Sequence, residues 1–433
     1  MSAHVLVIQL ARLGDLAQSL PLIFGLKQAG ARVDLICGFD PGDWLRERLD
    51  SLMVLDTRSL EQGLEDPAVL FTALRTRLGT LLAGSRHGSW DHVICLNDAV
   101  PATELAALLP GNSRCGAGVA GDPYAAWLAA LGEERGENLV HLSEMMLASV
   151  PWVEGQVSAA RVRNSRDIVI HSGSGSRWRQ LEPLFWRGLL RELVLAMPGH
   201  RLLLTGNASE RATCEKLALG IPSVINLAGR TSLDELLLTL ENAALVIAQD
   251  TGVLHLAAAT STPLLGLYHA SARVTETGPF QHGAHVLEVS ADCHPCHEGA
   301  PTCANLDCRH WIEFHGVARI ALAILRGETP PHPADPRLAL WRCEFEGGGW
   351  LLRDLGSGGW YRREEKLAQL AFLRGDGAHE PLMADGKAWR AACANGMDHA
   401  SWQRRLGIGS PVGLLETASH WKAACLTTKE LSR

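Results

Sequence analysis

Residues 4–37 read HVLVIQLARLGDLAQSLPLIFGLKQAGARVDLIC. The first seven are a continuous apolar run of strand length, which is typical of a strand buried in a parallel sheet. Residues 11–15 predict a short turn, residues 16–28 a helix that Gly30 ends, and residues 31–37 a second strand. Two parallel strands joined by a helix form a βαβ unit with a right-handed crossover, so the chain begins with an α/β domain.

The same pattern continues and then restarts farther along the chain. A helix at 69–83 and a strand at 92–96 extend the first domain, which we place at residues 1–152. Residues 151–166 have no periodicity and predict a linker. Strands are then predicted at 167–171, 201–205, 224–227, 245–248 and 263–268, and helices at 184–197, 210–219, 232–242, 252–260 and 311–325. Ser232 and Glu235 form a capping-box pattern at one helix start. Residues 166–328 therefore predict a second, doubly wound α/β domain.

The end of the chain differs from both domains. Four prolines between Pro330 and Pro336 interrupt it, and the residues from 337 to 433 are rich in glycine and tryptophan. We expect a C-terminal extension of strands and helices, and its composition indicates no chemistry.

Composition and charge narrow the class of protein. Hydrophobic residues make up 47% and charged residues 20%, which is ordinary for a large globular protein. No signal peptide and no membrane-spanning segment are expected, which leaves at most a peripheral contact with a membrane. Eleven cysteines without a secretion signal indicate reduced thiols or a metal site, and a cytoplasmic protein.

The net charge of −7 lies in the first part of the chain. Residues 1–150 hold 11 Lys and Arg against 18 Asp and Glu, and the remaining residues balance. An acidic first domain argues against a nucleic-acid partner and, more weakly, against a heavily phosphorylated acceptor held there.

Three segments put polar residues where ligands bind in parallel sheets, at the carboxyl ends of strands. The first, Arg12 to Asp15, follows the opening strand, and an N-cap role for Asp15 is the plain alternative. The second is Ser172-Gly-Ser-Gly-Ser176, followed by Arg179, where small residues let backbone amides approach an anion. A short loop without function is its alternative.

The third segment, residues 249–255, reads QDTGVLH. Asp250, Thr251 and Gly252 stand at a predicted helix N-terminus, and His255 follows on the same face. A hydroxyl and free amides suit a diphosphate. A cap needs only one such residue, so function is the favoured interpretation of this segment.

In this order and spacing, the segments resemble glycosyltransferase family 9. The family's opening turn ends in G-D, matched at residues 14–15, and its G-S-x-S loop is similar to residues 172–176. Three further matches are LTGNASE at 204–210, NLAGRTSL at 226–233 and DTGVLHLAA at 250–258. The resemblance covers residues 4–325. Val253 stands where proline is usual, and Arg179 and Leu181 stand where the family has Lys and Trp, which leaves the donor's identity open.

The resemblance implies two Rossmann-like domains facing a central cleft, the GT-B fold. It implies a bacterial, heptosyltransferase-like enzyme of lipopolysaccharide biosynthesis that inverts the anomeric centre without a catalytic metal. Asp15 would be the general base. The donor, with ADP-heptose as first candidate, would be held by the following residues: Ser174, Ser176, Arg179, Glu210, Asp250, Thr251, Gly252 and His255. The acceptor would be a hydroxyl on a glycan, on a lipopolysaccharide core or on a protein.

A cysteine cluster stands apart from this machinery. Cys293, Cys296, Cys303 and Cys308 have the spacing C-x2-C-x6-C-x4-C, which suits a structural Zn or Fe ion. A loop of reduced thiols without metal is the alternative, and nearby histidines could replace one thiol. The resemblance adds that bacterial protein heptosyltransferases carry an iron-binding cysteine finger.

Two other classes of function compete with a transferase. A nucleotide-sugar-binding or scaffold protein without turnover would not need Asp15. A dinucleotide-dependent oxidoreductase would need a G-x-G-x-x-G fingerprint after the first strand, and residues 11–16 lack it.

Overall fold

The structure is a computed structural model of the chain. It describes residues 2–55, 89–119, 138–291, 293–296 and 306–374, together with residues 79, 122, 124, 125 and 128. The helix predicted at 69–83 lies almost wholly outside these residues, as does the extension beyond residue 374.

The first domain is a parallel sheet in the order β3-β2-β1-β4-β5. Its strands are β1 (His4–Gln9), β2 (Arg32–Cys37), β3 (Ser51–Val54), β4 (Trp90–Cys95) and β5 (Gly111–Gly116). The helices described with it are α1 (Leu13–Gln28), α2 (Asp43–Arg46), α5 (Val100–Leu108) and α7 (Leu142–Ala148). The βαβ unit predicted from residues 4–37 is confirmed, since β1 pairs in parallel with β2 and α1 connects them.

The second domain repeats this plan with one more parallel strand. Its order, β9-β8-β7-β10-β11-β13, is that of a doubly wound fold. These strands are β7 (Asp167–His171), β8 (Arg201–Thr205), β9 (Val224–Asn226), β10 (Leu245–Gln249), β11 (Leu264–Tyr268) and β13 (His285–Val289). A small parallel pair, β6 (Ser158–Ala159) and β12 (Gln281–His282), ties the linker to this domain.

Helices and short 3-10 turns connect these strands. They are η3 (Arg177–Arg179), α8 (Pro183–Ala196), η4 (Ala208–Glu210), α9 (Arg211–Ala218), α10 (Leu233–Glu241), α11 (Gly252–Ala258), α12 (Val274–Thr277), α13 (Cys308–Trp311) and α14 (Phe314–Arg326). The predicted capping box is confirmed: the Glu235 amide donates to Ser232 Oγ at 3.2 Å, and the Ser232 amide to Glu235 Oε2 at 2.7 Å.

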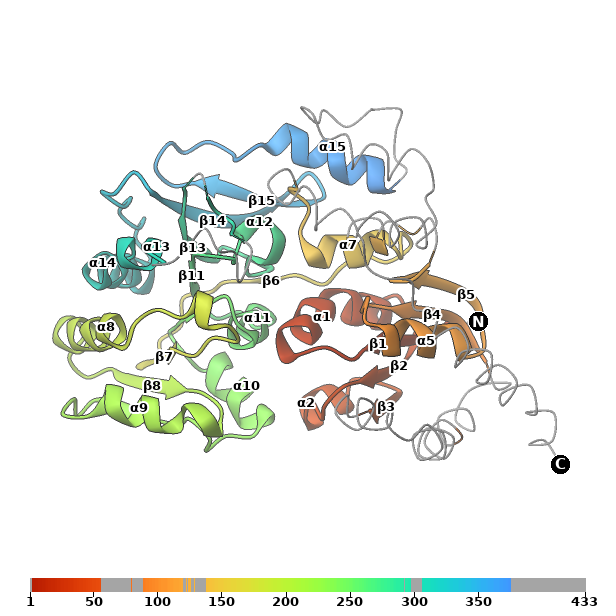
Figure 1. The fold of residues 1–433 in the computed structure, drawn as a ribbon, viewed down its shortest axis with the longest axis horizontal. Coiled ribbons are helices and arrows are strands. Elements are labelled where there is room, and N and C mark those ends of the chain that lie inside the picture. Colours follow the sequence, from red (N-terminus) through yellow and green to blue (C-terminus); the bar gives the residue numbers. More distant parts are fainter. Residues whose placement is uncertain are drawn as a thin grey trace.

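The first part of the extension joins the second sheet. Strands β14 (Leu338–Glu346) and β15 (Gly349–Asp354) continue it in antiparallel fashion beyond β13. Helix α15 (Arg363–Arg374) then passes over α7 of the first domain (Figure 1). There the buried carboxylate of Glu144 pairs with Lys366 at 2.5 Å and accepts the Trp350 amide at 2.7 Å. The extension therefore contacts both domains.

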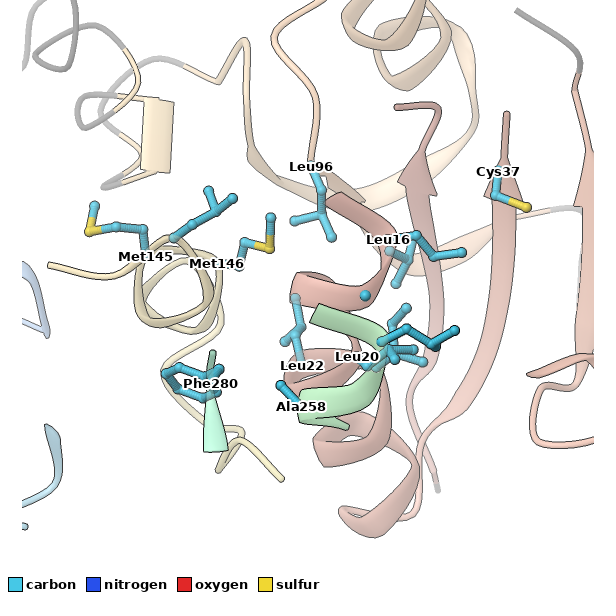
Figure 2. Packing of buried hydrophobic residues seen from close by; sticks show 14 of the residues in the cluster. Leu16, Leu20, Leu22, Cys37, Leu96, Met145, Met146, Ala258 and Phe280 are labelled. Atoms are coloured by element: carbon cyan, nitrogen blue, oxygen red, sulfur yellow. The ribbon is translucent and has the colours of Figure 1, made fainter. Parts of the chain in front are cut away.

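One apolar core crosses the boundary between the domains. Figure 2 shows Leu16, Leu20 and Leu22 of α1 packed close to Ala258 of α11, with Met145 and Met146 of α7 nearby. Because α1 belongs to the first domain and α11 to the second, the domains meet through buried apolar side chains. The expected fold, two Rossmann-like doubly wound domains with a C-terminal addition, is confirmed.

Candidate active site

The strand order places three loops at the switch points of the two sheets. In each sheet the order reverses between the first and the fourth strand of the domain, β1 and β4 or β7 and β10. Ligands of doubly wound sheets bind at this switch point, outside the carboxyl ends of the strands. The turn after β1, the Gly/Ser loop after β7 and the segment after β10 all leave from such ends.

The first turns of α1 and α11 are in direct contact. A Cβ atom at Gly252 would lie 3.0 Å from the backbone nitrogen of Gly14 and 3.1 Å from Cβ of Leu13. Glycine at position 252 is therefore what lets the two domains approach at this point.

Asp15 lies in the first turn of α1. The helix begins at Leu13, earlier than the predicted start at residue 16, so Arg12 is the N-cap and Asp15 is the third helical residue. The N-cap interpretation of Asp15 is wrong, although its carboxylate accepts the Arg12 amide at 3.2 Å. Burial raises the pKa of the Asp15 carboxyl above its ordinary value, and the nearby His255 lowers it only in part.

The Gly/Ser loop is held by short local bonds and by one buried glutamine. Ser174 Oγ accepts the Ser176 amide at 3.3 Å, and Ser176 Oγ accepts the Trp178 amide at 3.2 Å. Gln249, at the end of β10, donates to the carbonyl of Gly173 at 3.0 Å and accepts the Leu181 amide at 2.7 Å. It thereby fixes the loop against the β10 segment.

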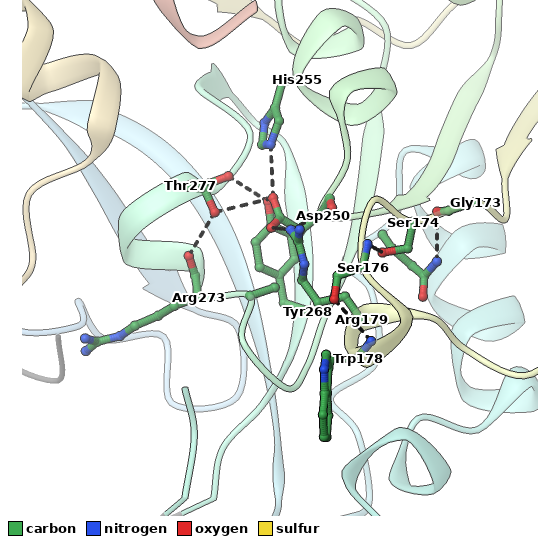
Figure 3. A network of polar contacts seen from close by, with 12 residues as sticks. Gly173, Ser174, Ser176, Trp178, Arg179, Asp250, His255, Tyr268, Arg273 and Thr277 are labelled. Carbon is green, nitrogen blue, oxygen red and sulfur yellow. Dashed lines mark hydrogen bonds and ion pairs between the residues drawn. The ribbon is translucent and has the colours of Figure 1, made fainter. Parts of the chain in front are cut away.

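Asp250 is the centre of a buried polar network (Figure 3). Its carboxylate accepts Arg179 Nη1 at 2.5 Å, His255 Nε2 at 3.0 Å and Thr277 Oγ1 at 3.3 Å. Burial alone would raise the pKa of Asp250, but the bond and charge of His255, followed by those of Arg179, hold it below its ordinary value. Asp250 is thus ionised, and it orients a guanidinium and an imidazole.

The other predicted residues lie close by. A Cβ atom at Gly173 would fall 1.9 Å from Glu210 Oε1, so the Glu210 carboxylate rests against the Gly/Ser loop. Its second oxygen accepts the Asn207 amide at 2.7 Å. The Thr251 hydroxyl at the start of α11 is buried, and no hydrogen-bond partner for it occurs in the described part of the chain.

Three residues that contribute to this arrangement were not predicted. Gln249 and Thr277 act through tertiary contacts, and Thr277 belongs to none of the predicted segments. Arg12 could have been noticed, because it is a cation in the turn directly after the first strand. A Cβ atom at Gly175 would lie 3.6 Å from Nη1 of Arg12 and 4.0 Å from Nη2 of Arg179.

The cysteine segment docks next to the second domain's sheet. The Cys296 amide donates to the Ala270 carbonyl at 2.9 Å, and Nε2 of His294 is 2.7 Å from the Ala272 carbonyl oxygen. Cys293, Cys296 and Cys308 are among the described residues, whereas Cys303 is not. Among the residues that are described, no group of three potential metal ligands occurs.

Comparisons with known proteins identify the second domain's relatives. Residues 186–305 match the model of glycosyltransferase family 9 (heptosyltransferase). Lipooligosaccharide heptosyltransferase 2 of Haemophilus influenzae is 31% identical over 101 residues, which are 22% of this chain. The match spans 28% of that relative's length, so this chain aligns with well under half of the curated protein.

Solved structures share the two-domain fold over most of the chain. A glycosyltransferase family 9 protein from Veillonella parvula superposes with a TM-score of 0.59 at 15% identity, covering 76% of this chain and 99% of that one. The E. coli heptosyltransferase WaaC, solved with ADP, has a TM-score of 0.51 at 19% identity, with coverages of 64% and 91%. No helix in the described ranges is long and apolar enough to cross a membrane.

Proposed function

We infer that this chain is a member of glycosyltransferase family 9 and transfers a heptose-like sugar from a nucleoside-diphosphate donor to an acceptor hydroxyl. One observation carries the proposal. Asp15 of the first domain lies in the first turn of α1, which touches the first turn of α11, and His255 of the Asp250 network is near enough to lower the pKa of the Asp15 carboxyl. ADP-heptose is the donor we favour, because the WaaC structure holds ADP.

In this reaction Asp15 acts as the general base. It takes the proton of the acceptor hydroxyl while that oxygen attacks the anomeric carbon of the donor sugar. The bond from the anomeric carbon to the diphosphate oxygen breaks, and its electron pair leaves with the diphosphate. A single displacement inverts the anomeric centre. Its raised pKa makes Asp15 a stronger base than an exposed aspartate.

The donor is held from the second domain. Ser174, Ser176, Thr251 and the amide of Gly252 surround the diphosphate, and Arg179 adds a positive charge oriented by Asp250. Asp250 and His255 are hydrogen-bonded to each other, so they act mainly as positioning residues. Glu210, beside the start of the Gly/Ser loop, would bind the nucleoside.

The acceptor is a hydroxyl on a glycan, a lipopolysaccharide core or a protein. The acidic first domain favours a neutral glycan or a protein over a phosphorylated core. Action in the cytoplasm is part of the proposal, because eleven cysteines suit a reducing compartment.

The test of this proposal combines a nucleotide-binding assay with a sugar-transfer assay. Thermal unfolding with ADP, GDP, UDP, dTDP and CMP identifies the donor nucleotide, and transfer from the matching nucleotide sugar is then assayed on each acceptor class. We expect Asp15→Asn to bind the nucleotide as the wild type does and to transfer no sugar. Wild-type binding without turnover on any acceptor would instead support a binding or scaffold protein.

We also propose that the cysteine cluster holds a structural Zn or Fe ion. Four thiols match the donor set of such a site, although the chemistry above needs no metal. Metal analysis of the purified protein should find one equivalent per chain, lost in Cys293→Ser and in Cys308→Ser. Equal metal content in wild type and both variants would refute this assignment.

A further inference from the structure

Arg12 stands apart from the other cations near the site. It comes from the first domain, immediately before α1, and its side chain is exposed. No hydrogen bond or ion pair of its guanidinium occurs within the described ranges, although it points across the domain boundary. Its Nη1 is 3.6 Å from where a Cβ atom of Gly175 would stand.

Arg179 approaches the same glycine from the second domain. Its Nη2 is 4.0 Å from that Cβ position, and its Nη1 is bound to Asp250 at 2.5 Å. Asp250 binds Arg179 directly, whereas the Arg12 guanidinium makes no such ion pair among the described residues and interacts with Asp15 only through space. Gly175 is exposed and has no side chain, so an anion can approach both guanidiniums over its backbone.

We propose that Arg12 is a catalytic residue that binds the sugar-linked phosphate of the donor over Gly175. This inference rests on the proposed function. As the bond between the anomeric carbon and the diphosphate oxygen breaks, the electron pair stays on that oxygen, and Arg12 stabilises the charge. Its guanidinium remains protonated throughout, so it donates hydrogen bonds and no proton is transferred.

The placement of Arg12 couples the two halves of the reaction. Its backbone amide donates to the Asp15 carboxylate at 3.2 Å, so the base and this cation share one turn of the chain. The guanidinium reaches Gly175 only because α1 and α11 are in contact. The arrangement that brings Asp15 to the acceptor therefore also brings Arg12 to the leaving group.

The test compares Arg12→Gln and Arg12→Lys with Arg32→Gln. Arg32 belongs to the same domain and lies at the amino end of β2, the end of the sheet away from the site, where it forms a partly buried ion pair with Asp50 at 4.0 Å. Binding of ADP and AMP is measured by calorimetry, and transfer by initial rates. Thermal unfolding confirms that each variant is folded.

We expect Arg12→Gln to lower kcat by about 100-fold or more, as removal of one donor to a developing oxyanion does. It should weaken ADP binding and leave AMP binding nearly unchanged. Arg12→Lys should keep part of both properties, and Arg32→Gln should match the wild type. A kcat for Arg12→Gln within threefold of wild type, or equal losses in Arg12→Gln and Arg32→Gln, would overturn the inference. Failure of the wild type to bind any nucleoside diphosphate would count against the proposed function itself.

Discussion

Gly252→Ala tests whether the contact between α1 and α11 aligns the site. The added methyl group would stand 3.0 Å from the Gly14 nitrogen and 3.1 Å from Cβ of Leu13. Ordinary contacts between such atoms are about 3.5–4.0 Å, so the two helices must separate by about 0.5 Å. Neither neighbour can rotate away, because one is backbone and the other a Cβ atom.

Two terms set the expected loss of stability. Overpacking of this kind costs about 1–3 kcal/mol, and replacing a helical glycine by alanine returns about 0.5–1 kcal/mol. These ranges combine to an expected loss of up to about 2.5 kcal/mol for Gly252→Ala. A misplacement of 1 Å can cost about 100-fold in rate, so a shift of half that size should lower kcat about tenfold.

The assays are thermal unfolding and the initial rate of sugar transfer. Gly316→Ala in α14 is the matched control, because a Cβ atom there meets no other atom within 4 Å, and alanine should stabilise the helix. If Gly252→Ala keeps both the Tm and the kcat of the wild type, the close contact between the domains is not part of the catalytic arrangement.

Three further changes test the proposed base, the contact of the C-terminal extension with the first domain, and a contact between the two domains. Because burial raises the folded-state pKa of Asp15, its charged form costs stability above that pKa. The rate of transfer should rise with pH through this pKa. Asp15→Asn should melt at a higher temperature than the wild type at pH 8 but not at low pH. If the variant and the wild type melt at the same temperature at both pH values, the idea of a buried carboxylate is contradicted. Glu144→Gln leaves Lys366 buried without a counter-charge, so it should lower the free energy of urea unfolding by about 3–5 kcal/mol. Adding Lys366→Met should recover much of this loss. If the losses of the two single variants simply add in the double variant, the two side chains are not paired. Asp234 of the second domain accepts a hydrogen bond from the Trp44 amide of the first at 2.7 Å. Asp234→Ala should therefore lower the free energy of unfolding by about 0.5–2 kcal/mol and speed hydrogen exchange at that amide. Unchanged exchange would show that this contact does not hold α2 in place.

Much of the fold could be predicted because its signals are local. The apolar run at residues 4–10, the turn before α1 and the restart at residue 167 each depend on neighbours along the chain. The capping box of Ser232 and Glu235 is likewise set within four residues. The rule about strand ends also predicts where the candidate site lies, in the loops that follow β7 and β10.

The details of the site were beyond local reasoning. The sequence placed Asp15 at the start of a helix, but the contact of Gly252 with Gly14 depends on the packing of two domains. The partners of Asp250 include Arg179, 71 residues away, and Thr277, 27 residues away. The approach of the Arg12 guanidinium to Gly175 likewise depends on the packing of the two domains.

The sequence by itself determined the opening βαβ unit, most strands and helices of the second domain, the order of the loops and the residue types available for chemistry. Only the tertiary structure decided which of those residues meet and how deeply Asp15 is buried. It also decided that the extension joins the sheet of the second domain while Lys366 of the extension pairs with Glu144 of the first. The physical reason is distance along the chain. Hydrogen-bonding and turn preferences act over a few residues, whereas burial and charge pairing depend on segments that only the packed core brings together.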